Sequence, residues 1–168
     1  MRIIAIDPGY DRLGVAVLEK KEGGKESLLF SECFVTDRRQ NFSQRLVAIA
    51  RRLREIIELY SPTELAIETL FVTKNQKTAM RVSEARGAII CQAADRGMGI
   101  FEFSPPEIKL ACVGDGRADK KSVIFMIEKI LGQKSGKIKQ DDEYDAIAVG
   151  LTYFATVAHR EKRRYPQG

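Results

Sequence analysis

Arg2-Ile3-Ile4-Ala5-Ile6-Asp7-Pro8-Gly9, residues 2–9, is the stretch around which the rest of the chain is organised. Its apolar and largely β-branched residues predict a short central strand that is buried on both faces. The strand ends on Asp7, and Pro-Gly then turns the chain. An ionised carboxylate at the end of a buried strand is costly unless a positive group pairs with it. The stretch therefore predicts a charged site at the end of this strand.

Two other segments also carry acids at the end of a predicted element. Residues 65–68 (Leu-Ala-Ile-Glu) form an apolar run that ends on Glu68, and residues 141–145 (Asp-Asp-Glu-Tyr-Asp) open an apolar helix. A helix predicted over about 43–60 separates the first strand from the Glu68 strand, so we expect these strands to pair in parallel. Open α/β sheets bind ligands at the carboxyl ends of such strands. We therefore expect Asp7 and Glu68 to meet at a metal-binding distance.

The acidic run 141–145 is expected to supply two further metal ligands from one face of a helix. Asp142 and Asp145 are three residues apart and share one helix face. Acids are also favoured at helix N-termini by the helix dipole, which is the simpler explanation for Asp141 and Glu143. Asp145 is followed at once by apolar residues, which draw it toward the core. The spacing favours Asp142 over Asp141 as its partner, although the two alternatives differ by one residue.

The remaining pattern predicts an α/β fold with a mixed five-stranded sheet flanked by helices. A Gly-rich turn at 20–25 joins two further strands, and Ser104-Pro105 is a strong helix start. Arginines on the polar face of the first helix (Arg45, Arg51, Arg52 and Arg54) are expected to be solvated. The further strands are expected at 13–19, 27–35 and 100–103, and the helices at about 43–60, 78–95, 105–113, 119–131 and 142–159.

Composition is that of a single globular domain. The chain has 168 residues, of which 44% are hydrophobic and 30% charged, enough for one core. We expect one domain over residues 1–159, followed by a basic, disordered tail over 160–168. The 28 basic residues exceed the 23 acidic ones, for a net charge of +5. This surplus is compatible with nucleic acid binding and equally with an ordinary basic protein.

The sequence also favours a cytoplasmic location. It has no apolar run long enough to cross a bilayer and no signal-peptide pattern at its start, so no membrane partner is expected. Its three cysteines are far apart and form no CxxC pair, which favours reduced thiols over a disulfide framework or a zinc site. Two of them, Cys91 and Cys112, are expected to be small buried residues.

A polar and basic loop follows the Glu68 strand at residues 71–77. Phe71, which heads it, has two interpretations. An aromatic residue just after a strand is most often part of the core. An aromatic residue beside cations also suits stacking on an unpaired base, worth about 1–3 kcal/mol. Under the second interpretation the DNA contacts in this loop are Phe71, Lys74, Asn75 and Lys77.

A series of short motifs runs along the chain from Ile3 to about Thr156. They are Ala5-Ile6-Asp7-Pro8-Gly9 with Gly14, Ala66-Ile67-Glu68 with Phe71, Lys74-Asn75, Glu84-Ala85-Arg86-Gly87, Pro106 to Lys109, Val113-Gly114-x-Gly116-x-Ala118-x-Lys120, and Asp142-x-x-Asp145-Ala146. In this order, the motifs resemble the RuvC family of Holliday junction resolvases, the crossover junction endodeoxyribonucleases of bacteria. Each motif is weak alone, and the specificity lies in finding all of them in family order.

The resemblance implies an RNase H-like fold and a homodimer that cuts four-way junctions in pairs during recombination and repair. It implies Mg²⁺-dependent hydrolysis that leaves 5′-phosphate and 3′-hydroxyl ends, and a branch-migration helicase complex as a possible partner. The helix at about 78–95 is, partly by resemblance, the candidate dimer interface. By position, the catalytic metal ligands are Asp7, Glu68, Asp142 and Asp145, Phe71 faces the junction, and Lys109 and Lys120 lie near the scissile phosphate.

The chemistry of the acids agrees with this. Carboxylate oxygens without a His or Cys cluster suit Mg²⁺ or Mn²⁺ and not zinc. Two such ions, about 4 Å apart, activate water and stabilise the leaving oxygen of a phosphodiester. Asp7, on the innermost strand, is the best candidate to bridge both ions.

Three other classes of protein remain as alternatives. Asp7-Pro8-Gly9 with Gly14 also resembles the phosphate loop of actin-like and sugar-kinase ATPases, but 168 residues hardly hold their second nucleotide-binding half. Related small nucleases act on RNA or on damaged DNA. A junction-binding module without activity is a third possibility, against which the full set of acids argues.

Overall fold

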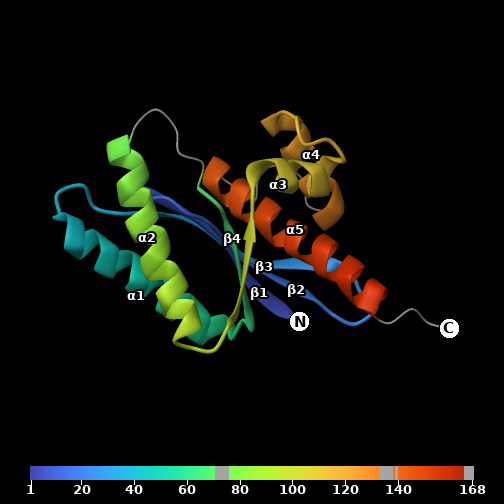
Figure 1. The fold of residues 1–168 in the computed structure, drawn as a ribbon, viewed down its shortest axis with the longest axis horizontal. Helices are drawn as coiled ribbons and strands as arrows, with labels where there is room; N and C mark the ends of the chain where they lie inside the picture. Colours follow the sequence, from blue (N-terminus) through green and yellow to red (C-terminus); the bar gives the residue numbers. More distant parts are fainter. Residues whose placement is uncertain (71–75, 133–137, 139, 165–168) are drawn as a thin grey trace.

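The computed structural model describes residues 1–70, 76–132, 138 and 140–164, with the backbone alone for 76, 77 and 158–164. A five-stranded sheet in the order β3-β2-β1-β4-β5 forms the centre of the molecule (Figure 1). Its central strand β1 pairs antiparallel with β2 and parallel with β4. The expected mixed sheet is therefore confirmed. The strands are β1 (Arg2–Asp7), β2 (Arg12–Lys20), β3 (Glu26–Val35), β4 (Glu64–Glu68) and β5 (Gly99–Phe103).

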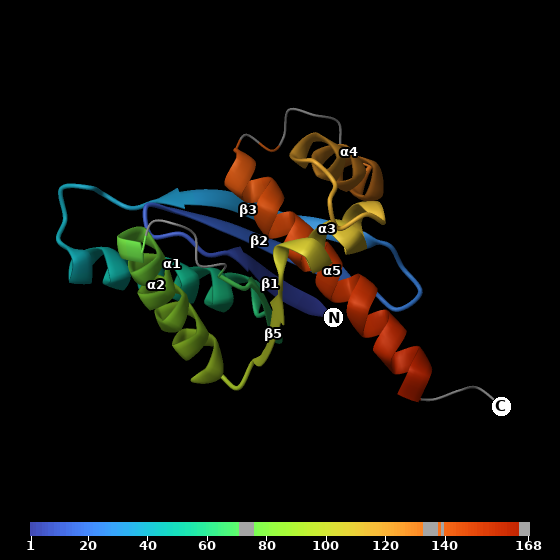
Figure 2. The same cartoon turned by 45° about the horizontal axis from the view of Figure 1, so that its top comes forward.

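Helices cover both faces of the sheet, in three layers (Figure 2). Among the described residues, two helices pack on one face and three on the other. The first pair is α1 (Phe42–Tyr60) and α2 (Gln76–Ala94), and the second group is α3 (Pro105–Val113), α4 (Lys120–Leu131) and α5 (Asp141–Arg164). None of the helices in the described ranges combines the length and apolar character that a membrane span requires.

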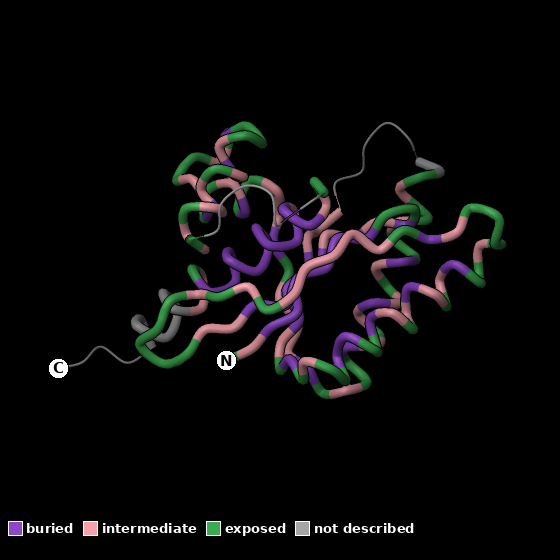
Figure 3. The backbone as a smooth tube through the Cα atoms, turned by 180° about the vertical axis from the view of Figure 1, so that it is seen from behind, coloured by how far each residue is buried: buried purple, intermediate pink, exposed green. Residues whose placement is uncertain are grey.

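The β1 strand divides the core in two because successive side chains of a strand point to opposite faces. Ile3 and Ala5 pack with α5, whereas Ile4 and Ile6 pack with α1 and α2, and all four are fully buried. This two-sided burial is why the strand is a continuous apolar run. Figure 3 shows buried residues concentrated in the inner strands, β1, β2 and β4, and in the first half of α5.

The long helix α5 approaches the sheet closely at Gly150. A Cβ atom at this position would stand 3.1 Å from the Ala5 Cβ and 2.5 Å from a Leu18 methyl carbon. Because glycine leaves this space free, α5 can run directly over β1 and β2. The helix therefore has a fixed height above the strand that ends on Asp7.

The end of α5 differs from the expected one. The helix continues past His159 to Arg164, so α5 extends beyond its expected end, while the disordered tail stays a prediction. Every residue between these two is a helix former, and the first breaker of the helix, Pro166, comes later. Residues 165–168 lie outside the described residues, and the domain boundary itself stays a prediction.

Two smaller expectations were wrong. Cys91 is exposed, although Cys112 is buried as expected. The buried stripe of α2 consists of Ala85, Ile89 and Ala93, and a residue two positions from Ile89 falls on another side of the helix. Arg45, expected to be solvated, is only 6% exposed, because its side chain binds the loop after β1.

Candidate active site

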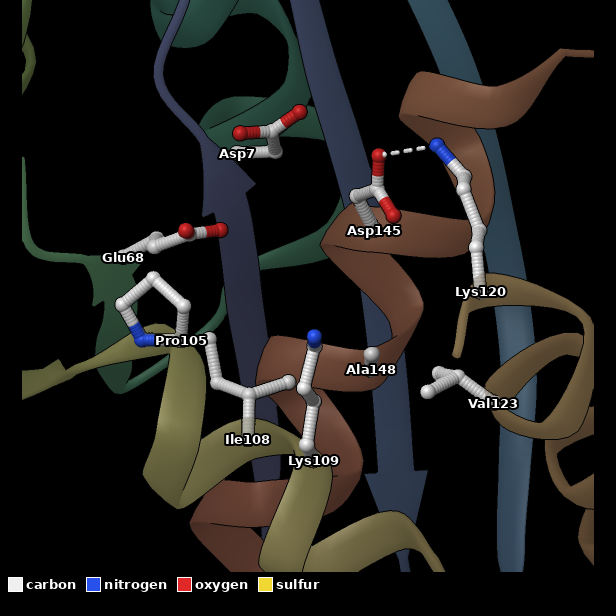
Figure 4. A pocket seen from close by; sticks show the side chains of 9 residues that line it. All are labelled: Asp7, Glu68, Pro105, Ile108, Lys109, Lys120, Val123, Asp145 and Ala148. Atoms are coloured by element: carbon white, nitrogen blue, oxygen red, sulfur yellow. Dashed lines mark hydrogen bonds and ion pairs between the residues drawn. The ribbon is translucent and has the colours of Figure 1, made fainter. Parts of the chain in front are cut away.

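A pocket opens at the edge of the sheet where β1 and β4 end (Figure 4). It lies between these strand ends and the three helices of the second face. Three acids expected from the sequence, Asp7, Glu68 and Asp145, point into it from three different elements, and Lys109 extends toward the same space. The lining comprises Asp7, Glu68, Pro105, Ile108, Lys109, Lys120, Val123, Asp145 and Ala148.

Strand register brings the first two acids together. β1 and β4 pair Ile6 with Ile67 in parallel, so Asp7 and Glu68 each follow that pair by one residue. Burial, followed by the charges of Glu68, Asp145 and Asp142, raises the pKa of Asp7 from 3.8 to about 7. Burial and the charge of Asp145 likewise raise the pKa of Glu68 to about 7. The pocket thus gathers carboxyl groups whose ionised forms are disfavoured by burial and by one another.

Gly14 on β2 allows the start of α5 to reach this edge. It pairs with Asp7 across the sheet, and a Cβ atom on it would stand 2.1 Å from the backbone oxygen of Asp142 and 3.1 Å from the Asp7 Cβ. Any side chain at this position would therefore push the first turn of α5 off the sheet. The close approach puts Asp142 and Asp145 near Asp7.

Asp145 is paired with a lysine. The Nζ of Lys120, at the start of α4, donates a 2.8 Å hydrogen bond to Asp145 (Figure 4). The same Nζ lies 3.4 Å from Asp141. Burial acts to lower the pKa of Lys120, but these two carboxylates raise it. Lys120 therefore stays charged within the pocket.

Asp142 does not line the pocket. Its carboxylate accepts hydrogen bonds from Nε and Nη2 of Arg12 at 3.0 and 2.6 Å. Burial acts to raise the pKa of Asp142, but the bonds from Arg12 help to hold it below its ordinary value. Of the two alternatives for this ligand, Asp142 is an electrostatic neighbour of Asp7, whereas Asp141 is 74% exposed and near Lys120.

The donor set fits hard divalent cations. Three carboxylates share the pocket, two of them with raised pKa values, and a bound cation would relieve both the burial and the repulsion. As the side chains stand, however, no three His, Cys, Asp or Glu residues of the described chain are close enough to hold an ion. Lys120 pairs with Asp145 and Arg12 pairs with Asp142, so two of the four expected ligands have a cationic partner.

Two arginines to which the sequence assigned no role at the site contact the ends of β1 and β4 or the loop that follows. Arg86 of α2 donates through Nε to the backbone oxygen of Glu68 at 3.3 Å and pairs with Glu102. Arg45 of α1 lies 3.9 Å from the Tyr10 ring centre, pairs with Asp11, and donates to the Thr36 hydroxyl at 2.8 Å. These contacts hold the backbone on either side of the acids.

Comparison with known proteins identifies the family. The family model described as crossover junction endodeoxyribonuclease RuvC matches residues 3–153. The chain belongs to the RuvC family. Among its relatives, the RuvC of Xanthomonas oryzae pv. oryzae is 40% identical over 152 residues, covering 90% of this chain and 86% of that protein. The RuvC of Moorella thermoacetica is 38% identical over 164 residues, covering 96% and 97%.

A solved RuvC structure has the same fold. The chain superimposes on T. thermophilus RuvC in complex with a Holliday junction substrate with a TM-score of 0.85 and 26% identity, covering 95% of this chain and 96% of that one. The expectation of the RuvC fold, RNase H-like, is therefore confirmed over nearly the whole length.

The expected DNA contacts of this RuvC chain are described only in part. Lys109 and Lys120 line the pocket with the acids. Phe71, Lys74 and Asn75 lie outside the described residues, and of Lys77 only the backbone, in α2, is described. The choice between the core and stacking interpretations of Phe71 therefore stays open.

Proposed function

We propose that this chain is a structure-selective endonuclease that resolves four-way (Holliday) DNA junctions by paired hydrolysis of phosphodiester bonds. The observation that carries the proposal is the meeting of Asp7, Glu68 and Asp145 in one pocket that also contains Lys109 and Lys120. Family membership and a relative solved with junction DNA support the same substrate. Cutting leaves 5′-phosphate and 3′-hydroxyl ends and serves recombination and repair.

RuvC nucleases are metal-dependent in general, and we propose Mg²⁺ as the ion here, two per site, with Mn²⁺ as a substitute. Asp7, Glu68, Asp145 and, after rearrangement, Asp142 would hold them. Bound Mg²⁺ supplies a nucleophilic water at neutral pH and stabilises the leaving oxygen. The chain's lysines act on the DNA itself, since ammonium groups at the pocket bind a phosphate and orient its scissile bond.

We further propose a cytoplasmic homodimer, with α2 at its interface and a branch-migration helicase as a partner. A four-way junction has two strands to cut, and a two-fold dimer supplies two pockets related by the same symmetry. The exposed side chain of Met80, 66% accessible on α2, is consistent with such an interface.

Replacing Asp7 with asparagine tests the catalytic assignment. Asp7→Asn removes a charge at the centre of the pocket, and we expect junction cutting to fall by at least about 10³-fold while junction binding persists. Cleavage of labelled four-way, forked, duplex and RNA substrates with Mg²⁺, beside a gel-shift assay, measures both. Normal incision by the variant would refute the role of Asp7, and preferential cutting of RNA or of plain duplex would refute the substrate.

A further inference from the structure

The carboxylate of Asp142 is turned away from the pocket that the other three acids share. Arg12, the first residue of β2, donates hydrogen bonds to this carboxylate from two guanidinium nitrogens at 3.0 and 2.6 Å. The same guanidinium also donates to the side-chain oxygen of Gln140, just before α5. The Cys33 thiol on β3 lies near enough to Asp142 for each group to shift the pKa of the other. Four groups from three segments are thus assembled on the β2–β3 side of α5.

The backbone of Asp142 is nevertheless in the right place for the pocket. It lies one helical turn before Asp145 on the same face of α5, and its backbone oxygen abuts Gly14, the cross-strand partner of Asp7. Its charge acts on Asp7. The Asp142 carboxylate is absent from the pocket lining and is paired instead with the charged group of Arg12.

We propose that Arg12 is a counter-ion that holds Asp142 outside the metal site and must release it before Asp142 binds metal. This inference rests on the proposed metal-dependent function. Arg12 and the metal compete for one carboxylate, so the ion pair lowers the metal affinity of the wild-type protein. Arg12 is therefore a positioning residue that acts through Asp142.

The strength of the pair sets the size of the effect. The side chains of Arg12 and Asp142 are 43% and 22% exposed, and ion pairs near the surface contribute modestly to stability. Breaking such a pair should change metal affinity by roughly two- to fivefold. The Lys120–Asp145 pair differs in one respect, because Asp145 already lines the pocket.

Titration of Mn²⁺ into the full-length, DNA-free protein by calorimetry tests the proposal. We expect Arg12→Gln to bind Mn²⁺ roughly two- to fivefold more tightly than wild type. Arg12→Lys keeps the charge but loses the two-nitrogen contact, so we expect an intermediate affinity. Equal or weaker binding by Arg12→Gln would overturn the proposal, since an arginine that merely braced the fold would lower affinity when removed.

Arg52→Gln is the matched control. Arg52 also holds carboxylates through its guanidinium, Glu32 at 2.6 Å and Glu55 at 2.9 Å, and its side chain is 32% exposed. The Arg52→Gln variant removes the same charge from a residue that does not line the pocket, and we expect its Mn²⁺ affinity to be unchanged. A gain equal to that of Arg12→Gln would reduce the effect to net charge and refute the specific role.

The wild-type titration separates the two proposals. Mn²⁺ binding by wild type without the expected gain in Arg12→Gln would contradict the role of Arg12 and leave the metal site standing. Absence of Mn²⁺ binding by wild type would contradict the metal site, and the role of Arg12 with it.

Discussion

Asp7 and Glu68 have pKa values of about 7, well above those of ordinary carboxyl groups. Burial is the largest cause for both, and the second is the charge of a neighbouring acid. Such shifts occur where a protein collects ionisable groups for chemistry, and a cation in the pocket would reverse them. The raised pKa values therefore indicate a site whose carboxylates a bound cation would stabilise in their ionised form.

Metal affinity should fall as the pH is lowered through 7. Protons and metal compete for the same oxygens, so lowering the pH from 8 to 6 should weaken Mn²⁺ binding about tenfold for each of the two groups. Calorimetric titrations at several pH values measure this dependence. An affinity that is constant between pH 8 and 6 would contradict the assignment of Asp7 and Glu68 as ligands.

The sequence identified Asp7, Glu68 and Asp145 because each ends or opens an element whose apolar pattern is clear. It could not indicate where the side chain of Asp142 points, since the partner, Arg12, is 130 residues away. Arg45 was misjudged for a similar reason. Helical phase places a residue on a face, but the loop that covers that face is known only from the fold.

Among the elements, α5 matters most to the site, and its position depends on glycine. The start of this helix touches β2 at Gly14, and its middle touches β1 and β2 at Gly150. Apolar periodicity predicted the helix correctly, as it did the strands, because long-range packing and local pattern agree there. The sequence did not reveal that Gly14 and Gly150 set the distance between helix and sheet.

Gly14→Ala should disrupt the site. The new Cβ would meet a backbone oxygen, which cannot move aside as a side chain can, so we expect a loss of about 1–3 kcal/mol in the free energy of unfolding. We also expect Mn²⁺ binding to weaken at least tenfold, because the acids of α5 move away from Asp7. Urea unfolding and calorimetry measure the two effects.

Gly150→Ala is the control for this variant. Gly150 lies more than one helical turn after Asp145 on α5. A Cβ atom on it would meet mainly the flexible side chain of Leu18. We expect a loss of stability with little change in Mn²⁺ affinity. The role of Gly14 would be disproved by a Gly14→Ala protein that is less stable but binds metal as wild type does.

At the scale of the whole molecule, the sheet brings together acids that are distant in sequence. The parallel pairing of β1 and β4, and with it the edge occupied by the pocket, followed from the rule that a helix between two buried strands makes them parallel. The full strand order β3-β2-β1-β4-β5 is known only from the structure. The dimer does not follow from the pairing of the strands, because it concerns a second chain.

The proposed dimer should be visible in solution. We expect sedimentation equilibrium at micromolar concentration to give twice the chain mass of 18.9 kDa. Met80→Glu introduces a charge on the exposed side of α2, and we expect it to shift the protein toward monomer without altering Mn²⁺ affinity. Wild type that sediments only as a monomer at working concentration would argue against the paired cut.

Anomalous diffraction from crystals soaked in Mn²⁺ is the most direct measurement of whether folding gathers these acids into a metal site. We expect peaks in the pocket, within about 2.0–2.5 Å of carboxylate oxygens of Asp7, Glu68 and Asp145. Ions bound elsewhere, with these three carboxylates left without metal, would contradict the proposed nuclease site.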